Sequence, residues 1–239
     1  MRVAVVTGAS SGIGAALCRR LKLEGWHVVG LSRGPAPDAD EHEACDVSDR
    51  EAVDAVAARV LERHPRIDLL ANNAGIAGRE PYLTAGPELV ERLLETNYLG
   101  AVWCLRAFLP GLEREAHVVN VVSIAGLVAV GPYSASKHAL LAFSRSLAVE
   151  LAPRGISVHT VNPGLVETPG FPQRARFRRG LYRLVATPEL VAERIVEAIE
   201  HGRREIVVPR WYRPAAWAQA LAPGLVARLL VRIGPLRGG

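Results

Sequence analysis

The sequence predicts a doubly wound α/β fold, with a seven-stranded, mostly parallel sheet and helices on both faces. Short apolar runs alternate with segments of helical periodicity along residues 1–210, which is the pattern of a parallel sheet with crossover helices. The first run leads straight into a glycine-rich turn and a helical segment, the usual opening of such a sheet. The chain has 239 residues and 49% hydrophobic content, enough for one sizeable core.

The elements can be placed in order along the chain. Strands are expected at residues 2–6, 26–32, 43–45, 67–71, 117–122, 156–161 and 205–208. Helices are expected at residues 15–23, 48–63, 88–109, 133–151 and 188–201, with Ser48 and Thr187 as two of the N-caps. Residues 34–43 are rich in Pro, Gly and Asp and are too few for a full crossover helix. We therefore expect one domain over residues 1–210, followed by a separate tail.

The glycine-rich turn after the first strand has the spacing G-x-x-x-G-x-G. Glycines there allow a tight turn, close approach of a phosphate and close packing of the helix on the strand. The positive end of the helix dipole also attracts an anion. We therefore expect this turn to bind the pyrophosphate of a dinucleotide, through Gly8, Ser10, Ser11, Gly12, Ile13 and Gly14.

Arg33 follows the second expected strand, where a dinucleotide site selects between its two common cofactors. A carboxylate at this point binds a ribose 2′-hydroxyl, whereas an arginine accommodates a 2′-phosphate. Neither Leu31, Ser32 nor Arg33 is acidic. The residue therefore favours NADP(H), with NAD(H) as the alternative if Arg33 is only a surface charge.

Tyr133 and Lys137 are four residues apart in an expected helix, so they lie on one face about one turn apart. A nearby ammonium favours a phenolate, which predicts a lowered tyrosine pKa and proton transfer near neutral pH. Lys22 and Lys137 are the only lysines among 29 basic residues. Because an ammonium can be desolvated and a guanidinium cannot readily lose its charge, Lys137 is expected to serve chemistry.

Several motifs together resemble the short-chain dehydrogenase/reductase (SDR) family over residues 1 to about 210. They occur in family order: Thr7-Gly8-x-x-x-Gly12-x-Gly14, Asn72-Asn73-Ala74-Gly75, Asn97, Ser123, Tyr133-x-x-x-Lys137 and Pro163-Gly164. The resemblance implies a Rossmann-type catalytic domain that binds NAD(P) and is commonly a homodimer or homotetramer.

The resemblance also implies roles for individual residues. Tyr133 would be the catalytic acid/base, Ser123 would bind the substrate oxygen, and Lys137 would bind the nicotinamide ribose. Asn97 would bend its helix and hold a water that relays protons towards Lys137. The remaining cofactor contacts would come from Asp46 and Val47 at the adenine, and from Asn73, Ala74, Gly75, Pro163, Gly164, Val166 and Thr168 along the groove.

The implied activity is NADP(H)-dependent interconversion of a carbonyl and a secondary alcohol by hydride transfer. The alternatives are an NAD-dependent dehydrogenase of the same fold and a non-catalytic dinucleotide-binding regulatory protein. A pure binder has no need of Ser123, which favours the enzyme. The expected partner is a small carbonyl or alcohol substrate of apolar character.

Two departures from the family pattern affect the pocket. Only nine residues separate Ser123 from Tyr133, where about a dozen are common, so the intervening loop must be tighter. The segment between Arg33 and Asp46 is short and is expected to lack a helix, which opens the adenosine end. Residues 169–186 form the expected substrate loop, and five arginines at 174–183 suit either an anionic substrate or a solvated surface.

The tail over residues 211–239 contains two short apolar helical stretches, 215–221 and 225–233, on either side of Pro223-Gly224. Neither reaches the roughly 20 residues of a membrane span. We expect the tail to dock on the body or on a partner subunit in preference to a membrane surface.

Composition narrows the compartment and the partners. The three cysteines are far apart and lack metal-ligand spacing, so we expect a reducing compartment, the cytoplasm, and no metal. The net charge of +5 comes with only 5% aromatic residues and no interleaved basic and aromatic run. We therefore expect no nucleic-acid partner.

Overall fold

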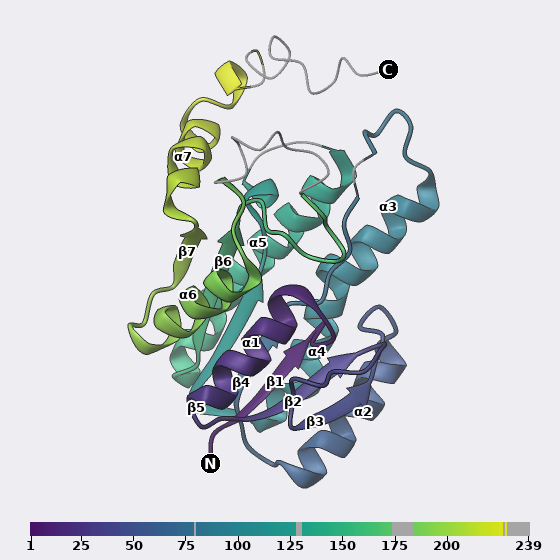
Figure 1. Cartoon of the computed structure of the whole chain (residues 1–239), viewed down its shortest axis with the longest axis vertical. Coiled ribbons are helices and arrows are strands. Elements are labelled where there is room, and N and C mark those ends of the chain that lie inside the picture. Colours follow the sequence, from purple (N-terminus) through teal and green to yellow (C-terminus); the bar gives the residue numbers. More distant parts are fainter. Residues whose placement is uncertain (79, 128–130, 174–183, 227, 229–239) are drawn as a thin grey trace.

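A seven-stranded parallel sheet forms the centre of the molecule (Figure 1). The structure is a computed structural model, and it describes residues 1–78, 80–127, 131–173, 184–226 and 228. The strands are β1 (Val3–Thr7), β2 (His27–Ser32), β3 (Glu41–Ala44), β4 (Ile67–Asn72), β5 (Leu112–Val121), β6 (Ser157–Pro163) and β7 (Glu205–Val208). Their order is β3-β2-β1-β4-β5-β6-β7, and every pairing is parallel. The predicted doubly wound α/β fold is confirmed.

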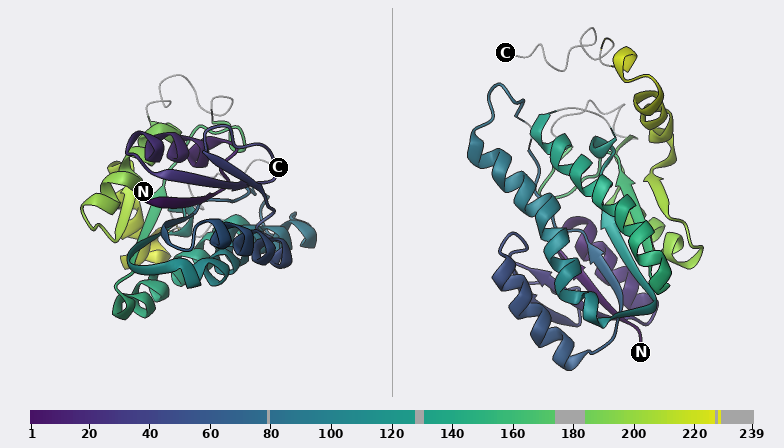
Figure 2. Two further views of the ribbon diagram at one scale, coloured as in Figure 1. Left: turned by 90° about the horizontal axis from the view of Figure 1, so that it is seen from below. Right: turned by 180° about the vertical axis from the view of Figure 1, so that it is seen from behind.

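Helices cover both faces of this sheet, as Figure 2 shows from below and from behind. One face carries α1 (Gly12–Leu23) and α6 (Pro188–Glu200), which pack on each other. The other carries α2 (Arg50–Arg63), α4 (Gly100–Phe108) and α5 (Gly131–Leu151), with α3 (Pro87–Leu94) leading into α4. The sheet therefore separates two hydrophobic cores, one under each helical layer.

The buried strands explain why these two cores form. β1 is buried along its whole length, and β2, β4 and β6 are each buried at all but one position near the start. A strand covered on both faces needs apolar residues without alternation, and Val-Ala-Val-Val in β1 meets that need. The carboxyl ends of all these strands meet at one edge, where a ligand crevice is expected.

Local differences from the predicted elements have clear causes. Asp49, and not Ser48, is the N-cap of α2, because the Asp49 carboxylate accepts from the Ala52 amide at 3.1 Å. Ser48 instead donates its hydroxyl to Asp46 at 2.7 Å. Thr187 caps α6 as predicted, accepting from the Leu190 amide.

Two elements differ in length or regularity. β5 begins at Leu112, five residues earlier than predicted, and its pairing with β4 shifts register between Leu112 and His117. The helix expected at residues 88–109 is divided by a π-helical turn, Glu95–Leu99, which contains Asn97. The segment between Arg33 and Asp46 contains no helix, as predicted.

The described part of the tail forms α7 (Arg213–Leu221), which begins two residues before the predicted stretch. Trp211, Trp217, Leu221 and Leu225 are all more than half exposed. Most of the second predicted stretch, and the arginine-rich segment 174–183, lie outside the described residues. Among the residues that are described, no helix is both long enough and apolar enough to cross a membrane.

Candidate active site

A cavity of about 1350 Å³ lies at the carboxyl ends of the strands. Its walls come from the β1–α1 turn and from the segments that follow β2, β4, β5 and β6. Of the residues predicted for the site, those that line it are Gly8, Ser10, Ser11, Gly12, Ile13, Arg33, Asp46, Val47, Asn73, Ala74, Gly75, Ser123, Tyr133, Lys137, Pro163, Gly164, Val166 and Thr168. Gly14 and Asn97 are not among the lining residues.

The glycine turn is built around close backbone approaches. Gly8 has φ of +67°, and a Cβ there would lie 2.9 Å from the Cα of Ala74. A Cβ on Gly14 would lie 2.2 Å from the carbonyl oxygen of Gly8. Ser11 precedes α1 without a side-chain cap, so the amides at this helix start face the cavity region without that competitor. The turn therefore has the free space and the electrostatics to receive a phosphate group.

Thr7 holds this turn against the segment after β4. Its hydroxyl accepts from the amides of Asn73 and Ala74, both at 2.9 Å, and donates to the carbonyl of Ala71. The side-chain amide of Asn73 donates back to the Thr7 carbonyl at 2.8 Å. Thr7 is 2% exposed, so it positions two cavity walls without lining the cavity. Its place in the first motif was the available signal for this positioning role.

Ser123 and Tyr133 are brought together although only nine residues separate them. Ser123 follows β5 and accepts from the Ala125 amide at 3.1 Å, which starts a short 3-10 turn. Tyr133 lies in the first turn of α5, partly exposed towards the cavity. A hydrogen bond joins the Ser123 and Tyr133 side chains. The two hydroxyls are therefore paired despite their short separation along the sequence; residues 128–130 between them lie outside the described residues.

The pKa of Tyr133 differs from the expectation. Burial raises this pKa above its usual value, and the hydrogen bond with Ser123 only partly offsets that effect. Lys137 is not among the groups that shift the Tyr133 pKa. Its ammonium donates to the Val121 carbonyl at 3.1 Å. Tyr133 is thus protonated at neutral pH in this structure, which is the form of a proton donor.

Lys137 is 4% exposed. Burial lowers its pKa from 10.5 to about 8, because the charged form loses hydration. A Cβ on Gly75 would lie 3.4 Å from Lys137 Nζ and 3.0 Å from Asn97 Oδ1. The absence of a side chain at Gly75 therefore leaves room for both groups beside the cavity wall.

Asn97 lies behind the cavity wall, at 1% exposure. Its Oδ1 accepts from the Ile76 amide at 2.8 Å, and its Nδ2 donates to the Ile76 carbonyl and to Ser136 Oγ, each at 3.0 Å. It therefore ties the segment after β4 to the residue next to Lys137. The π-helical turn around Asn97 agrees with the predicted distortion of its helix.

Arg33 and Asp46 line the part of the cavity wall that follows β2 and β3. The guanidinium is 3.8 Å from the Asp46 carboxylate, and the two side chains are 74% and 42% exposed. Burial raises the Asp46 pKa, but hydrogen bonds from Ser48 and the charge of Arg33 together lower it. A basic and an acidic group thus face the same solvent-exposed end.

Other residues of the cavity wall were not predicted from the sequence. Segment 76–83 contributes the described residues Ile76, Ala77, Gly78, Glu80, Pro81, Tyr82 and Leu83. Its place after the carboxyl end of β4 was the available signal. Tyr212 packs so closely on Gly164 that a Cβ there would lie 2.2 Å from the ring, and its hydroxyl donates to the Leu184 carbonyl. The start of the tail therefore supports the cavity from outside.

Comparisons with known proteins identify the family. The model of the short chain dehydrogenase family matches residues 2–178. A putative ketoacyl reductase of Streptomyces coelicolor is 38% identical over 187 residues, which is 70% of this chain and 71% of the relative. Dehydrogenase/reductase SDR family member 7B of Bos taurus is 30% identical over 259 residues, which is 95% of this chain and 80% of the relative. The chain belongs to the short-chain dehydrogenase/reductase family, and with it to the oxidoreductases.

Solved structures agree on the fold. A short chain dehydrogenase/reductase from Burkholderia phymatum in complex with NAD has a TM-score of 0.83 at 26% identity, with 94% of each chain covered. A short chain dehydrogenase from Burkholderia cenocepacia in complex with NADP has a TM-score of 0.79 at 25% identity, covering 87% of this chain and 96% of the other. Similar folds therefore bind either dinucleotide.

Proposed function

We propose that this chain is an NADP(H)-dependent oxidoreductase that interconverts a carbonyl and a secondary alcohol. One observation carries the proposal: Ser123, Tyr133 and Lys137 line the same cavity as the glycine turn. The turn suits a pyrophosphate, and the three side chains suit proton transfer to an oxygen atom. Membership of an oxidoreductase family supports the same reading.

The residues that line the cavity suit a nicotinamide dinucleotide. The glycine turn would hold the pyrophosphate, Asp46 and Val47 the adenine, and the segment Asn73–Gly75 the middle of the groove. Pro163, Gly164, Val166 and Thr168 would hold the nicotinamide end. When bound, the nicotinamide supplies the hydride that reduces the carbonyl carbon.

The chain's own residues handle the proton. In reduction, Ser123 Oγ donates a hydrogen bond to the substrate oxygen as negative charge develops there. The Tyr133 hydroxyl then gives that oxygen its proton. The pKa of Lys137 is about 8, so at pH 7 its ammonium is mainly charged. Its ammonium, which donates to the Val121 carbonyl in this structure, would bind the nicotinamide ribose, and oxidation follows the same path in reverse.

The substrate is proposed to be a small apolar carbonyl compound or its alcohol. Ile76, Leu83 and Phe171 add apolar surface to the wall of the cavity that Tyr133 also lines. The relative named as a putative ketoacyl reductase acts, by its name, on a carbonyl group. Cytoplasmic location and a homodimer or homotetramer complete the proposal.

The preference for NADP(H) rests on Arg33, which lines the cavity and is not buried in a structural ion pair. Replacing Arg33 with Asp should move the ratio of kcat/KM for NADPH over NADH towards NADH by at least tenfold. Arg50→Asp is a matched control, since Arg50 is also exposed and lies on α2 outside the cavity wall. An unchanged ratio in Arg33→Asp would make Arg33 a surface charge only.

Thermal unfolding with NADP, NADPH, NAD and NADH tests the proposal first. A ligand that binds only the folded state raises Tm by mass action, so NADPH should raise it more than NADH does. Turnover of a panel of ketones should follow. Cofactor binding without turnover of any carbonyl would favour a non-catalytic dinucleotide-binding protein, and no Tm shift would exclude both.

A further inference from the structure

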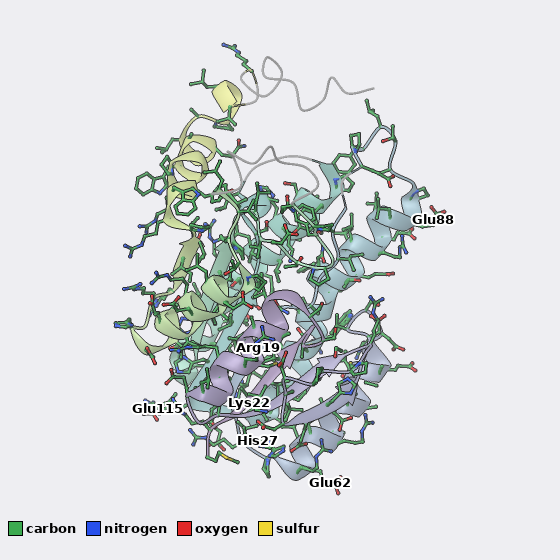
Figure 3. All side chains as sticks on the ribbon, viewed as in Figure 1. Arg19, Lys22, His27, Glu62, Glu88 and Glu115 are labelled. Atoms are coloured by element: carbon green, nitrogen blue, oxygen red, sulfur yellow. The ribbon has the colours of Figure 1, made fainter. Side chains whose placement is uncertain are left out.

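Three side chains at the end of the sheet opposite the cavity converge on one point. They are His27 at the start of β2, Glu41 at the start of β3 and His64 at the C-cap of α2. Figure 3 labels His27 at this lower end, near Lys22. Parallel strands begin at the same edge, and a crossover helix returns to it, so the topology itself brings these three positions together.

The geometry of the three groups is that of a ligand set. Nε2 of His27 and Nε2 of His64 each lie 2.7 Å from the same oxygen, Oε1 of Glu41. The three ligand atoms lie within 4.8 Å of one another, and the imidazole centroids are 5.0 Å apart. Tetrahedral zinc with bonds of about 2.0–2.1 Å places its ligand atoms about 3.3 Å apart. Each of the two N–O distances would have to lengthen by about 0.6 Å to admit the ion.

We propose that His27, Glu41 and His64 form a binding site for a divalent transition-metal ion of the zinc type. Two imidazoles and one carboxylate are ligands that such ions prefer, whereas Mg²⁺ and Ca²⁺ prefer oxygen atoms. The three side chains are 19%, 28% and 18% exposed. A fourth position therefore faces water.

Outer-shell contacts hold Glu41 in position for this role. Arg63 donates to Oε2, the second carboxylate oxygen, through Nε at 3.1 Å, and its Nη2 forms an ion pair with the same oxygen at 3.0 Å. Oε1 is left to the two imidazoles. Such hydrogen bonds orient a metal-binding carboxylate.

Nearby charges do not repel a cation. Arg63 and Arg59 are each paired with Glu43, and Lys22 is paired with Asp40 at 2.9 Å. Asp40 also accepts from the Val28 amide, which fixes the start of β3 against β2. The site is therefore charge-balanced around its ligands and held in place by the backbone.

The proposed ion would add one more tether to an edge strand of the sheet. β3 has four residues, pairs only with β2 and lacks the usual helix before it. An ion bound by β2, β3 and α2 would join Glu41 to His27, 14 positions earlier, and to His64, 23 positions later. Its effect is on stability, because the site lies at the opposite end of the strands from the cavity.

Zinc titration of the full chain, freed of metal by a chelator, tests the proposal. A chromophoric zinc chelator as competitor gives the stoichiometry and affinity, and thermal unfolding gives a second readout. The wild type should bind one zinc ion per chain and gain in Tm. His27→Gln and His64→Gln should each weaken binding by at least about tenfold, since even outer-shell changes cost that much.

The glutamine variants keep an N–H donor for Glu41 while removing a good zinc ligand, so the metal-free fold is preserved. His201→Gln is the matched control, because His201 is exposed on α6 and bonds only to the Glu197 carbonyl among the described contacts. Wild-type protein that binds no zinc, or equal binding in all variants, would overturn the proposal. The three side chains would then be a hydrogen-bonded tether and nothing more.

Discussion

Tyr133 and Lys137 illustrate how burial sets the chemistry of single residues. The hydroxyl and the ammonium lie at the cavity, and burial moves each towards its neutral form. The tyrosine therefore keeps its proton at neutral pH, and the lysine is close to losing one. This combination favours reduction near neutral pH and oxidation at higher pH.

Tyr133→Phe should reduce kcat at least about a hundredfold, the range expected for loss of a general acid. The substitution removes one hydroxyl and leaves the ring, so Tm shifts with NADPH should match those of the wild type. Initial rates and thermal unfolding on the same preparation check both statements. Retained turnover would remove Tyr133 from the proposed mechanism.

Lys137 gives a stability that depends on pH. Its pKa is about 8 in the folded protein and 10.5 in an unfolded chain. Below pH 8 both states bind the proton and burial of the charge costs stability. As pH rises from 8 to 10.5 the folded state releases the proton first, so the free energy of unfolding increases. The full difference is on the order of 3 kcal/mol.

Lys137→Met should abolish this increase. Urea unfolding of both proteins from pH 7 to pH 10 measures it, and the other titrating groups cancel in the difference. The wild type should gain on the variant as the pH rises. A difference that stays constant with pH would show that the buried ammonium keeps its ordinary pKa.

At the scale of elements, the β1–α1 unit depends on contacts that its local sequence does not reveal. Gly14 lies inside α1, where alanine would be preferred over glycine by about 1 kcal/mol. The tertiary structure reverses that preference, since a Cβ would lie 2.2 Å from Gly8 O and 2.6 Å from Asn73 Nδ2. Helix packing against the turn therefore decides this position.

Gly14→Ala should lower the free energy of unfolding by about 1–3 kcal/mol, the usual cost of overpacking. Gly34→Ala is the control, because nothing lies within 4 Å of a Cβ there and its φ is not positive. Urea unfolding compares the two. Equal stability of both variants would mean that α1 can move away from Gly8 at little cost.

The long helix expected at residues 88–109 shows what periodicity misses. The apolar pattern correctly predicts helical structure there. The Asn97 side chain, however, forms hydrogen bonds with the backbone of Ile76 and with Ser136. These bonds cross between elements, and the helix adopts a π turn around them. A helix-breaking residue in mid-helix was the only local sign.

At the scale of the molecule, the described start of the tail leaves large apolar side chains exposed. Tyr212 packs on Gly164, yet Trp217 and Leu221 are 63% and 86% exposed. Apolar side chains so exposed on one helix are typical of an interface. The docking of the tail stays a prediction, and a partner subunit is the surface we expect.

Trp217→Ser with Leu221→Ser should weaken self-association and leave the unfolding of the monomer nearly unchanged. Sedimentation velocity over a range of protein concentrations measures the first, and urea unfolding the second. Leu23→Ser serves as control, since Leu23 is 82% exposed on α1, away from the tail. An association constant equal to that of the wild type would show that α7 contacts no second copy.

The sequence by itself determined the class of fold and the location of the cavity. Unbroken apolar runs define buried parallel strands, and the segments after those strands must share one edge. The residues predicted for the cofactor and the substrate oxygen came from the glycine turn and from the family resemblance, and all but Gly14 and Asn97 line one cavity. Most of these motifs directly follow a strand of the parallel sheet, so their positions along the chain place them at the same edge of the sheet.

Only the tertiary structure decided how side chains from distant segments meet. It placed Thr7 between two cavity walls, raised the pKa of Tyr133, and directed the Lys137 ammonium to Val121. It also gathered His27, Glu41 and His64, whose spacing matches no local ligand motif. Burial and contact between residues far apart in the chain depend on packing in three dimensions, and no local pattern records them.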